Sequence, residues 1–363
     1  MNIAFRVDAS LLIGTGHVMR CLTLADALRE RGHRCRFICR DLGGNLIGWV
    51  RSRGYEVMVL PAVAEPPDEP AADEGRAMYG AWLTTSQEAD ATQCVEAIRG
   101  MAPDWLIVDH YALDQVWERV LRPHTGRLML IDDLADRPHC CDLLLDQTLG
   151  REPDDYAALV PEHARLLCGT DYALLRLEFG QLRERSLARR RSGVFRRLLI
   201  SMGGVDKDNV TTAVLEALCK VALAEETRIF VVMGSTAPWL ERVLEVATSM
   251  PWPTEVRSGV DDMARLMCTS DLAIGAAGAT SWERCCLGLP TLMLVLAENQ
   301  RTIARQLGAT GAVVLLNDPL DRELPLALEP LAQEPARLRA MSENAARLVD
   351  GAGTMRVVRV LES

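Results

Sequence analysis

Short apolar runs alternate with segments of helical spacing along the first half of the chain. Within 18–31, for example, Leu22, Ala25 and Leu28 fall on one face of a helix. The apolar runs predict strands at 3–8, 34–39, 55–60, 105–108, 128–131 and 143–145. The segments between them predict helices at 18–31, 46–53, 81–100 and 113–121, and a loop rich in Pro, Glu, Asp and Ala at 61–76. Buried strands that alternate with helices are typical of a parallel sheet covered on both faces, so the pattern predicts an α/β fold.

The same alternation restarts in the second half. Strands are predicted at 198–202, 228–233, 271–274, 292–296 and 312–315, with helices between them and a mostly helical tail from 324 onward. A run rich in arginine, 181–197, separates the halves and is interpreted as a solvated basic linker, with a binding role as the alternative. The chain therefore predicts two Rossmann-like domains, 1–180 and 198–363, whose parallel sheets face a central cleft.

Composition narrows the classes of partner. The formal net charge of −10, without a basic face outside 181–197, argues against nucleic acid. The chain starts as a strand rather than a signal peptide and has no apolar run of about 20 residues, so we expect a cytoplasmic protein without a membrane span. The eleven cysteines are interpreted as reduced and buried, since their spacing makes no zinc pattern. The segment 139–142 and the pair Asp132-Asp133 are weaker metal candidates, and we expect no metal and no cofactor.

The loop after the first strand is the leading candidate site. Asp8 ends the strand, Gly14 and Gly16 follow, and His17 opens the next helix. Two glycines let a ligand approach the backbone, a helix start offers unpaired N–H groups, and a neutral imidazole can accept a proton from water. The alternative is a plain glycine turn with a histidine at a helix start, because this Gly-x-Gly lacks the third glycine of a dinucleotide fingerprint.

Further polar residues follow other predicted strands, where ligands bind in parallel sheets. His110 and Tyr111 follow the strand 105–108, and Gly203 and Gly204 follow 198–202. After 271–274, small residues lead to a helix start that contains Gly278, Thr280, Ser281 and Glu283. These residues suit a phosphate and a ribose diol, although Glu283 is equally explained as a capping carboxylate.

Two more pairs are candidates. Asn299 and Gln300 follow the strand 292–296, where Asn299 is alternatively a helix cap. Tyr172 and Arg176 precede the basic segment and are expected to line the cleft.

Several of these stretches together resemble a known family. They are Phe5-Arg-Val-Asp8, Ile13-Gly-x-Gly-His17 with Arg20, Ile107-Val-Asp-His-Tyr111, Ile131-Asp-Asp133, Cys168-Gly-x-x-Tyr-Ala-Leu-Leu-Arg176, Met202-Gly-Gly-x-Asp206 and Asn299-Gln300. In this order, over about residues 3–310, they resemble the nucleotide-sugar hydrolases of pseudaminic acid biosynthesis. That family removes UDP from UDP-2,4-diacetamido-2,4,6-trideoxy-β-L-altropyranose and is similar in fold to the GT-B glycosyltransferases.

The resemblance implies a function and roles for residues. It implies that the second domain holds UDP, with the pyrophosphate and ribose at 278–283 and Glu283 on the ribose hydroxyls. It also implies that His17 is the catalytic base and that Asn299 reaches the substrate. Our hypothesis for the mechanism is that water attacks the anomeric carbon with inversion and without a metal. Asp8, Asp109 and His110 are each candidates to orient His17, which we expect to face the cleft.

Two other readings remain open. One is a GT-B glycosyltransferase that uses a UDP-amino-sugar donor, and the other is an inactive nucleotide-sugar binding protein. The sequence leaves the configuration and substituents of the sugar, the role of the C-terminal tail and the oligomeric state undetermined.

Overall fold

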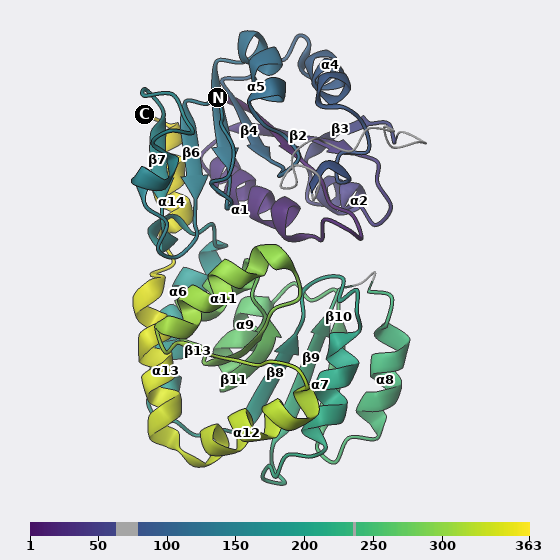
Figure 1. The fold of residues 1–363 in the computed structure, drawn as a ribbon, viewed down its shortest axis with the longest axis vertical. Helices are drawn as coiled ribbons and strands as arrows, with labels where there is room; N and C mark the ends of the chain where they lie inside the picture. The colour runs from purple at the N-terminus through teal and green to yellow at the C-terminus, as the bar shows by residue number, and fades with distance from the viewer. Residues whose placement is uncertain (63–78, 235–236) are drawn as a thin grey trace. The chain divides into compact units, whose positions relative to one another are not determined.

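The structure is a computed structural model that describes residues 1–62, 79–234 and 237–363 (Figure 1). It divides into two compact units. The first contains residues 1–174 and 354–363, and the second contains 175–353. Apart from residues 61 and 62, the loop predicted at 61–76 lies outside the described residues.

The first unit is built on a seven-stranded parallel sheet of order β3-β2-β1-β4-β5-β6-β7. Phe5 in β1 pairs with Phe37 in β2 on one side and with Ile107 in β4 on the other. The chain thus fills one half of the sheet outward from β1 and then returns to the other side of β1, which creates a switch point at the carboxyl ends of β1 and β4. The strands are β1 (Asn2–Val7), β2 (Arg34–Arg40), β3 (Glu56–Leu60), β4 (Trp105–Asp109), β5 (Arg127–Ile131), β6 (Leu143–Asp146) and β7 (Arg165–Cys168).

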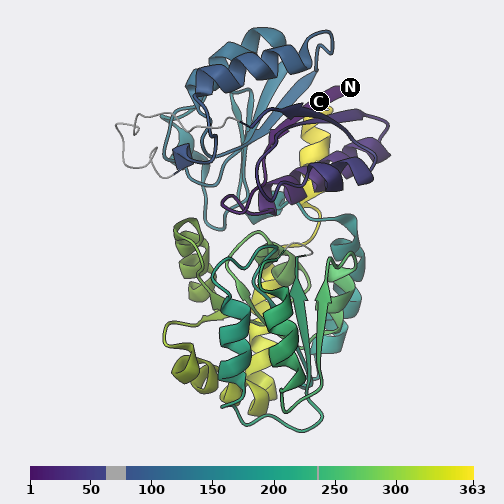
Figure 2. The same cartoon turned by 90° about the vertical axis from the view of Figure 1, so that its right-hand side faces the viewer.

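Helices cover both faces of this sheet, and the strands β4 and β6 are buried along their whole length (Figure 2). One core joins the sheet to α1 (Gly16–Glu30), α2 (Ile47–Ser52) and α14 (Gly353–Leu361). The other core joins it to α4 (Gln87–Ile98) and α5 (Gln115–Leu121). Short 3₁₀ turns lie at Arg122–His124, Pro153–Tyr156 and Thr170–Tyr172. The predicted α/β architecture with helices on both faces is therefore confirmed for this unit.

A buried ionic network fastens α4 to the sheet. The Asp90 carboxylate on α4 accepts hydrogen bonds from Arg6 Nη2 at 2.7 Å, Arg40 Nη2 at 2.5 Å and Trp117 Nε1 at 2.9 Å. Asp90, Arg6 and Arg40 are completely buried. Burial would raise the pKa of Asp90, but the two guanidinium groups lower it to about 2. The charges are mutually compensated, so the network holds only while every member is present.

The second unit repeats the plan with a six-stranded parallel sheet of order β10-β9-β8-β11-β12-β13. Its switch point lies between β8 and β11. The strands are β8 (Arg197–Ser201), β9 (Arg228–Met233), β10 (Thr254–Ser258), β11 (Leu272–Ala276), β12 (Thr291–Leu294) and β13 (Val313–Leu315). The helices are α6 (Leu177–Arg190), α7 (Val210–Leu218), α8 (Leu240–Thr248), α9 (Met263–Thr269), α10 (Thr280–Cys286), α11 (Arg301–Ala309), α12 (Leu320–Gln333) and α13 (Pro335–Leu348), and a 3₁₀ turn covers Glu298–Gln300.

The basic segment 181–197 differs from the predicted solvated linker. Most of it belongs to α6, and its arginines satisfy carbonyl groups of the second unit. Arg183 donates to the carbonyls of Cys286 and Ala346, and Arg190 donates to those of Met267 and Ser270. The first unit accordingly ends at residue 174 rather than 180.

The C-terminal tail also differs from its predicted place. Its last helix, α14, belongs to the first unit, where it lies beside β6 and β7 (Figure 1). Val357, Val358 and Leu361 are fully buried in the core that also contains Leu143 and Leu167. Burial of these three side chains is the physical reason that the chain end returns to the first sheet.

We expect Asp90→Asn to lower the free energy of unfolding by about 3 kcal/mol or more, because Arg40 then lacks a countercharge and Arg6 keeps only its pair with Asp8. Urea unfolding followed by circular dichroism measures this. Glu96→Gln is the matched control on the same helix, since Glu96 pairs with Arg99 at the surface, and it should change little. An unchanged midpoint for Asp90→Asn would contradict this account of the network.

Candidate functional site

The switch point of the first unit brings the first turn of α1 against the end of β4. His17 and Arg20, one helical turn apart on α1, both point at Asp109, the last residue of β4. Residues three apart lie on the same face of a helix, so one carboxylate can reach both. Asp109 is 1% exposed and His17 is 8% exposed, which makes this a largely desolvated cluster.

The geometry identifies Asp109 as the partner that orients His17. Asp109 Oδ1 lies 2.6 Å from His17 Nδ1. Arg20 donates to the same carboxylate twice, from Nε at 2.6 Å and from Nη2 at 2.8 Å. Of the three candidates from the sequence, Asp109 therefore occupies the position, because Asp8 and His110 bond elsewhere.

The charge state of Asp109 fixes the role of the imidazole. Burial would raise the pKa of Asp109, but the charge and hydrogen bonds of Arg20 and His17 hold it well below its usual range. An ionised carboxylate only accepts hydrogen bonds, so Nδ1 of His17 carries the hydrogen. In the neutral imidazole, Nε2 is then the acceptor, and the described residues form no hydrogen bond to it. The pair can therefore take a proton from a bound hydroxyl or water.

Aromatic rings restrain the imidazole from the side. The Tyr111 ring lies 4.6 Å from His17 at an interplanar angle of 88°, and Trp82 lies 5.7 Å away at 73°. Trp82 in turn stacks on Tyr111 at 5.3 Å. The sequence analysis missed Trp82, since nothing in its local spacing connects it to a histidine 65 positions earlier.

Arg20 and Tyr111, both predicted to bind substrate, are linked through Asp133. Arg20 Nη1 donates to Asp133 Oδ2 at 2.7 Å, and the Tyr111 hydroxyl donates to the same oxygen. The guanidinium of Arg20 is therefore fully engaged by Asp109 and Asp133. Its place beside His17 supports a positioning role rather than direct contact with a ligand.

Asp8 and His110 lie on the opposite side of the switch point. Asp8 is paired with Arg6 Nη1 at 2.6 Å, accepts the backbone N–H of Arg40, and lies 3.3 Å from His110 Nε2. His110 Nδ1 accepts the backbone N–H of Ala112. Both predicted binding residues are thus buried beside each other, Asp8 Oδ2 and His110 Nε2 form no hydrogen bond with the described residues, and any contact with substrate stays a prediction.

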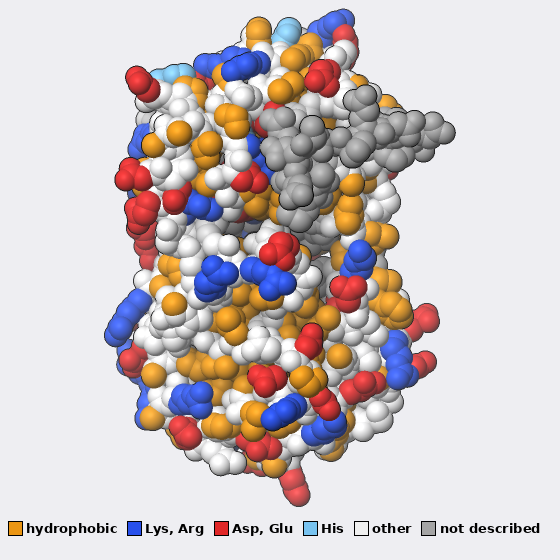
Figure 3. Space-filling view, viewed as in Figure 1, with side chains coloured by type: hydrophobic (Ala, Val, Ile, Leu, Met, Phe, Trp, Pro, Cys, Tyr) orange, Lys and Arg blue, Asp and Glu red, His pale blue; other side chains and the backbone are white. Residues whose placement is uncertain are grey.

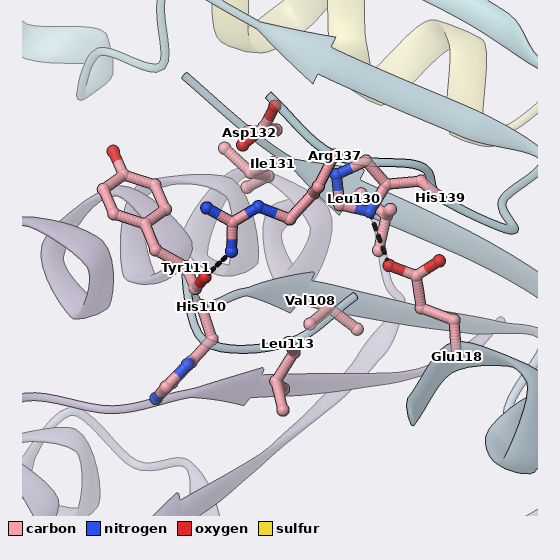
Figure 4. A pocket seen from close by; sticks show the side chains of 10 residues that line it. All are labelled: Val108, His110, Tyr111, Leu113, Glu118, Leu130, Ile131, Asp132, Arg137 and His139. Carbon is pink, nitrogen blue, oxygen red and sulfur yellow. Dashed lines mark hydrogen bonds and ion pairs between the residues drawn. The ribbon is translucent and has the colours of Figure 1, made fainter. Parts of the chain in front are cut away.

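A third buried histidine, His139, lines a small cavity together with Tyr111 and Arg137. His139 Nδ1 lies 2.7 Å from Glu118 Oε1, and Arg137 donates to the carbonyl of Tyr111 (Figure 4). Burial would lower the pKa of His139, but the hydrogen bond and charge of Glu118 outweigh it and raise the pKa. These groups line a cavity of about 10 Å³, which is room for one water molecule. His139 is therefore a member of a structural ion pair. Over the described residues, no group of three or more His, Cys, Asp and Glu is arranged to hold a metal ion.

The two loop glycines, Gly14 and Gly16, occupy different backbone environments. Gly14 has φ of +81°, a conformation that favours glycine, and its N–H donates to the carbonyl of Ser10. Gly16 begins α1. A Cβ at either position would meet no atom within 4 Å, so both glycines border open space beside His17.

In the second unit, the turn after β11 collects the other predicted residues. Gly278 borders open space, and the hydroxyl oxygens of Thr280 and Ser281 both lie within hydrogen-bonding distance of Arg284. Glu283 caps nothing, because α10 has no side-chain cap. Burial raises the pKa of Glu283 to about 7, although the charges of Arg176 and Arg284 oppose the rise. Glu283 does lie in the first turn of α10, where a carboxylate is favoured, so both interpretations of this residue stay open.

Four more candidates, Gly203, Gly204, Asn299 and Gln300, also belong to the second unit. Gly203 has φ of +94° directly after β8, and the carbonyl of Gly204 meets Gly234 so closely that a Cβ there would lie 1.9 Å away. Gln300 Oε1 accepts the N–H of Leu296, and the partly buried Asn299 does not cap α11.

The Tyr172–Arg176 motif is divided between the units. Tyr172 packs on the core of the first unit, whereas Arg176 begins α6 and pairs with Glu178 at 3.1 Å. The expectation that His17 faces a cleft stays a prediction.

Neither the surface charge nor the length of the helices points to a further class of partner. On the face drawn in Figure 3, Lys and Arg are interspersed with Asp and Glu. Among the described helices, none has the length and apolar character to cross a membrane.

Comparisons with known proteins agree with the resemblance predicted from the motifs. Residues 198–355 match the glycosyltransferase family 28 C-terminal domain. The UDP-2,4-diacetamido-2,4,6-trideoxy-beta-L-altropyranose hydrolase of Campylobacter jejuni is 26% identical over 313 residues, which cover 86% of this chain and 97% of that protein. The predicted resemblance to this hydrolase is therefore confirmed.

Solved structures identify the fold. MurG of Acinetobacter baumannii superposes with a TM-score of 0.66 at 14% identity, with 99% of each chain covered. The UDP-GlcNAc 2-epimerase of Neisseria meningitidis, bound to UDP-GlcNAc, has a TM-score of 0.57 at 12% identity and is covered in full. The predicted GT-B-like fold is confirmed, and the chain is a distant homologue of enzymes that process nucleotide sugars.

Proposed function

We propose that this chain hydrolyses a UDP-activated diacetamido-trideoxy sugar, releasing UDP and free 2,4-diacetamido-2,4,6-trideoxy-L-altrose for pseudaminic acid or a related nonulosonic acid. The observation that carries the proposal is the buried His17–Asp109 pair, whose Nε2 is left as a proton acceptor. The similarity to the Campylobacter jejuni hydrolase over 86% of the chain supports the choice of substrate.

The proposed reaction is an inverting displacement at the anomeric carbon. His17 Nε2 takes a proton from water while the water oxygen forms a bond to the anomeric carbon. The bond between that carbon and the phosphate oxygen breaks on the opposite side, and UDP leaves with the bonding electrons. Asp109 stabilises the imidazolium that forms, as in other histidine–carboxylate pairs. The step is metal-independent because His17 itself activates the water.

In this proposal the second unit binds UDP. The turn with Gly278, Thr280 and Ser281 receives the diphosphate, Gly203 and Gly204 border the same carboxyl edge of the sheet, and Glu283 accepts from the ribose hydroxyls. Asn299, which is free of a capping role, is assigned to the substrate.

A glycosyltransferase is the second candidate, and the match of residues 198–355 to a glycosyltransferase domain favours it. The same pair could deprotonate a sugar hydroxyl in place of water. NMR of the protein incubated with UDP-2,4-diacetamido sugars and no acceptor separates the candidates. Equal amounts of UDP and free sugar, with inverted anomeric configuration at first release, support hydrolysis. UDP binding without product indicates a transferase lacking its acceptor or an inactive binding protein.

His17→Asn should lower turnover by roughly 100- to 10,000-fold, because general base catalysis has about that value, while UDP affinity stays within twofold. Coupled UDP release measures the first quantity and calorimetry the second. His33→Asn is the control, since His33 pairs with Glu362 at the other end of α1 and should leave turnover unchanged. EDTA should also have no effect on turnover. Near-normal turnover of His17→Asn would remove the imidazole from the mechanism.

The raised pKa of Glu283 leads us to expect that nucleoside binding depends on pH. Its carboxyl has a pKa of about 7, so an ionised carboxylate that accepts from the ribose diol becomes more abundant as the pH rises. Uridine, which has no phosphate to titrate, should bind about tenfold more tightly at pH 8 than at pH 6 if only the ionised form binds. Glu283→Gln should abolish this dependence in calorimetric titrations. The same slope in the variant would show that another group is responsible.

A further inference from the structure

Arg284 is a buried cation directly beneath the turn that follows β11. It is 2% exposed, although its side chain projects from the first turns of α10. Nη2 donates to the carbonyl of Ala276 at 2.6 Å and to Ser281 Oγ at 3.0 Å, and Nη1 lies 3.4 Å from Thr280 Oγ1. Because Ala276 is the last residue of β11, the guanidinium lies at the carboxyl edge of the sheet, where ligands bind in parallel folds.

The strand is shaped to accommodate this guanidinium. A Cβ on Gly275 would lie 2.5 Å from Arg284 Nη1 and 2.9 Å from the carbonyl oxygen of Ser201. Both distances are below the closest approach of real Cβ atoms, and one of the atoms belongs to the backbone of β8. The guanidinium can therefore lie here only because residue 275 has no Cβ, which the carbonyl of Ser201 excludes as well.

The positive charge is not balanced within the unit. No described carboxylate forms an ion pair with Arg284, and its Nε is buried without a hydrogen-bond partner. Burial lowers the pKa of Arg284 to about 10, although Cys285 and Glu283 oppose the change. The pKa of Glu283 is itself about 7, so near neutral pH its carboxylate supplies only part of a countercharge. A buried, uncompensated cation is costly, and a bound anion would offset that cost.

The hydrogen bonds of Arg284 determine how the hydroxyl groups of Thr280 and Ser281 are oriented. Arginine has donors and no acceptor, so the oxygens of Thr280 and Ser281 must accept from it. Each hydroxyl has one hydrogen, which must then point away from the guanidinium. The partly buried Thr280, beside the open space at Gly278, is placed to offer its hydrogen to a ligand oxygen.

We propose that Arg284 is a positioning residue for the diphosphate of UDP, supplying a fixed positive charge beneath the turn and turning the hydroxyl hydrogens of Thr280 and Ser281 toward the phosphate oxygens. The inference rests on the proposed function in that the nucleotide is UDP. It does not depend on whether the sugar is transferred to water or to another acceptor.

Calorimetric titration of UDP, UMP and uridine into Arg284→Met tests the proposal. At pH 8, where Glu283 is mostly ionised, UDP affinity should fall at least tenfold and UMP affinity should fall less, while uridine affinity should change least because Arg284 acts on it only through the pKa of Glu283. Arg284→Lys retains the charge without the forked donors and should lie between wild type and Arg284→Met for UDP.

Arg190→Met is the matched control. Arg190 is also a buried arginine of this unit with a pKa lowered to about 10 by burial, but it donates to the carbonyls of Met267 and Ser270, before β11 begins. Its loss should reduce thermal stability and leave UDP affinity within twofold. A graded loss with phosphate number for Arg284→Met, absent in Arg190→Met, would support the inference.

Two outcomes would overturn it. One is a folded Arg284→Met that binds UDP like wild type, and the other is an equal loss for UDP and uridine, which a merely structural role would produce. If Arg284→Met does not fold, Thr280→Val provides the same test, with an expected loss of several-fold for UDP alone and an unchanged affinity overturning the inference. Wild-type protein that binds UDP without hydrolysing it would contradict the proposed function and leave this inference intact.

Discussion

The Asp109 carboxylate is the constraint on which the first unit depends. It ends β4, it is buried, and its oxygens receive one imidazole nitrogen and two guanidinium nitrogens from the first turns of α1. Because an unpaired carboxylate at this place would be costly, α1 must begin where Arg20 and His17 can both reach it. The conformation of the loop between β1 and α1, including the positive φ of Gly14, follows from that requirement.

The two units use the same topological position for opposite electrostatic purposes. At the edge between β1 and β4, the acidic side chains are matched by arginines, as in the pairs Arg6–Asp8 and Arg20–Asp133. Because Arg6 and Arg20 are each paired with carboxylates, neither guanidinium is left to donate to His17 Nε2, which remains a proton acceptor. At the edge between β8 and β11, Arg284 has no carboxylate partner. One edge is thus suited to remove a proton and the other to receive an anion.

Much of this arrangement could be predicted from sequence because it is encoded locally. The Gly-x-Gly-His17 loop, the apolar strands and the α/β alternation each occupy a few neighbouring positions. β7 and β10 were missed because Arg165–Cys168 is short and Thr254–Ser258 is largely polar, so neither forms a clear apolar run. The segment 181–197 is interpreted as a linker because its arginines are typical of a solvated surface, whereas Arg183 and Arg190 donate to carbonyls of distant segments.

The arrangement of the site was less predictable, because it depends on tertiary packing rather than on local sequence patterns. Sheet order places β4 beside β1, and the choice of Asp109 over Asp8 and His110 depends on which face of the sheet each side chain meets, because successive side chains of a strand point to opposite faces. Trp82 joins the site through stacking on Tyr111, and Arg284 through its fit against Gly275. The first relation joins positions far apart in the chain and the second depends on how α10 packs against β11, so neither has a periodicity that a single sequence displays.

The surroundings of His17 bear on which nucleophile it activates. Two aromatic rings pack nearly perpendicular to the imidazole, so the approach to Nε2 is narrowed from the side of Tyr111 and Trp82. The pair that these two rings form is itself stacked and buried, which makes it costly to displace for a bulky acceptor. A water molecule needs no such displacement. The packing that keeps Nδ1 on Asp109 therefore also favours the smallest nucleophile, and this supports the proposed hydrolysis over transfer to a second sugar.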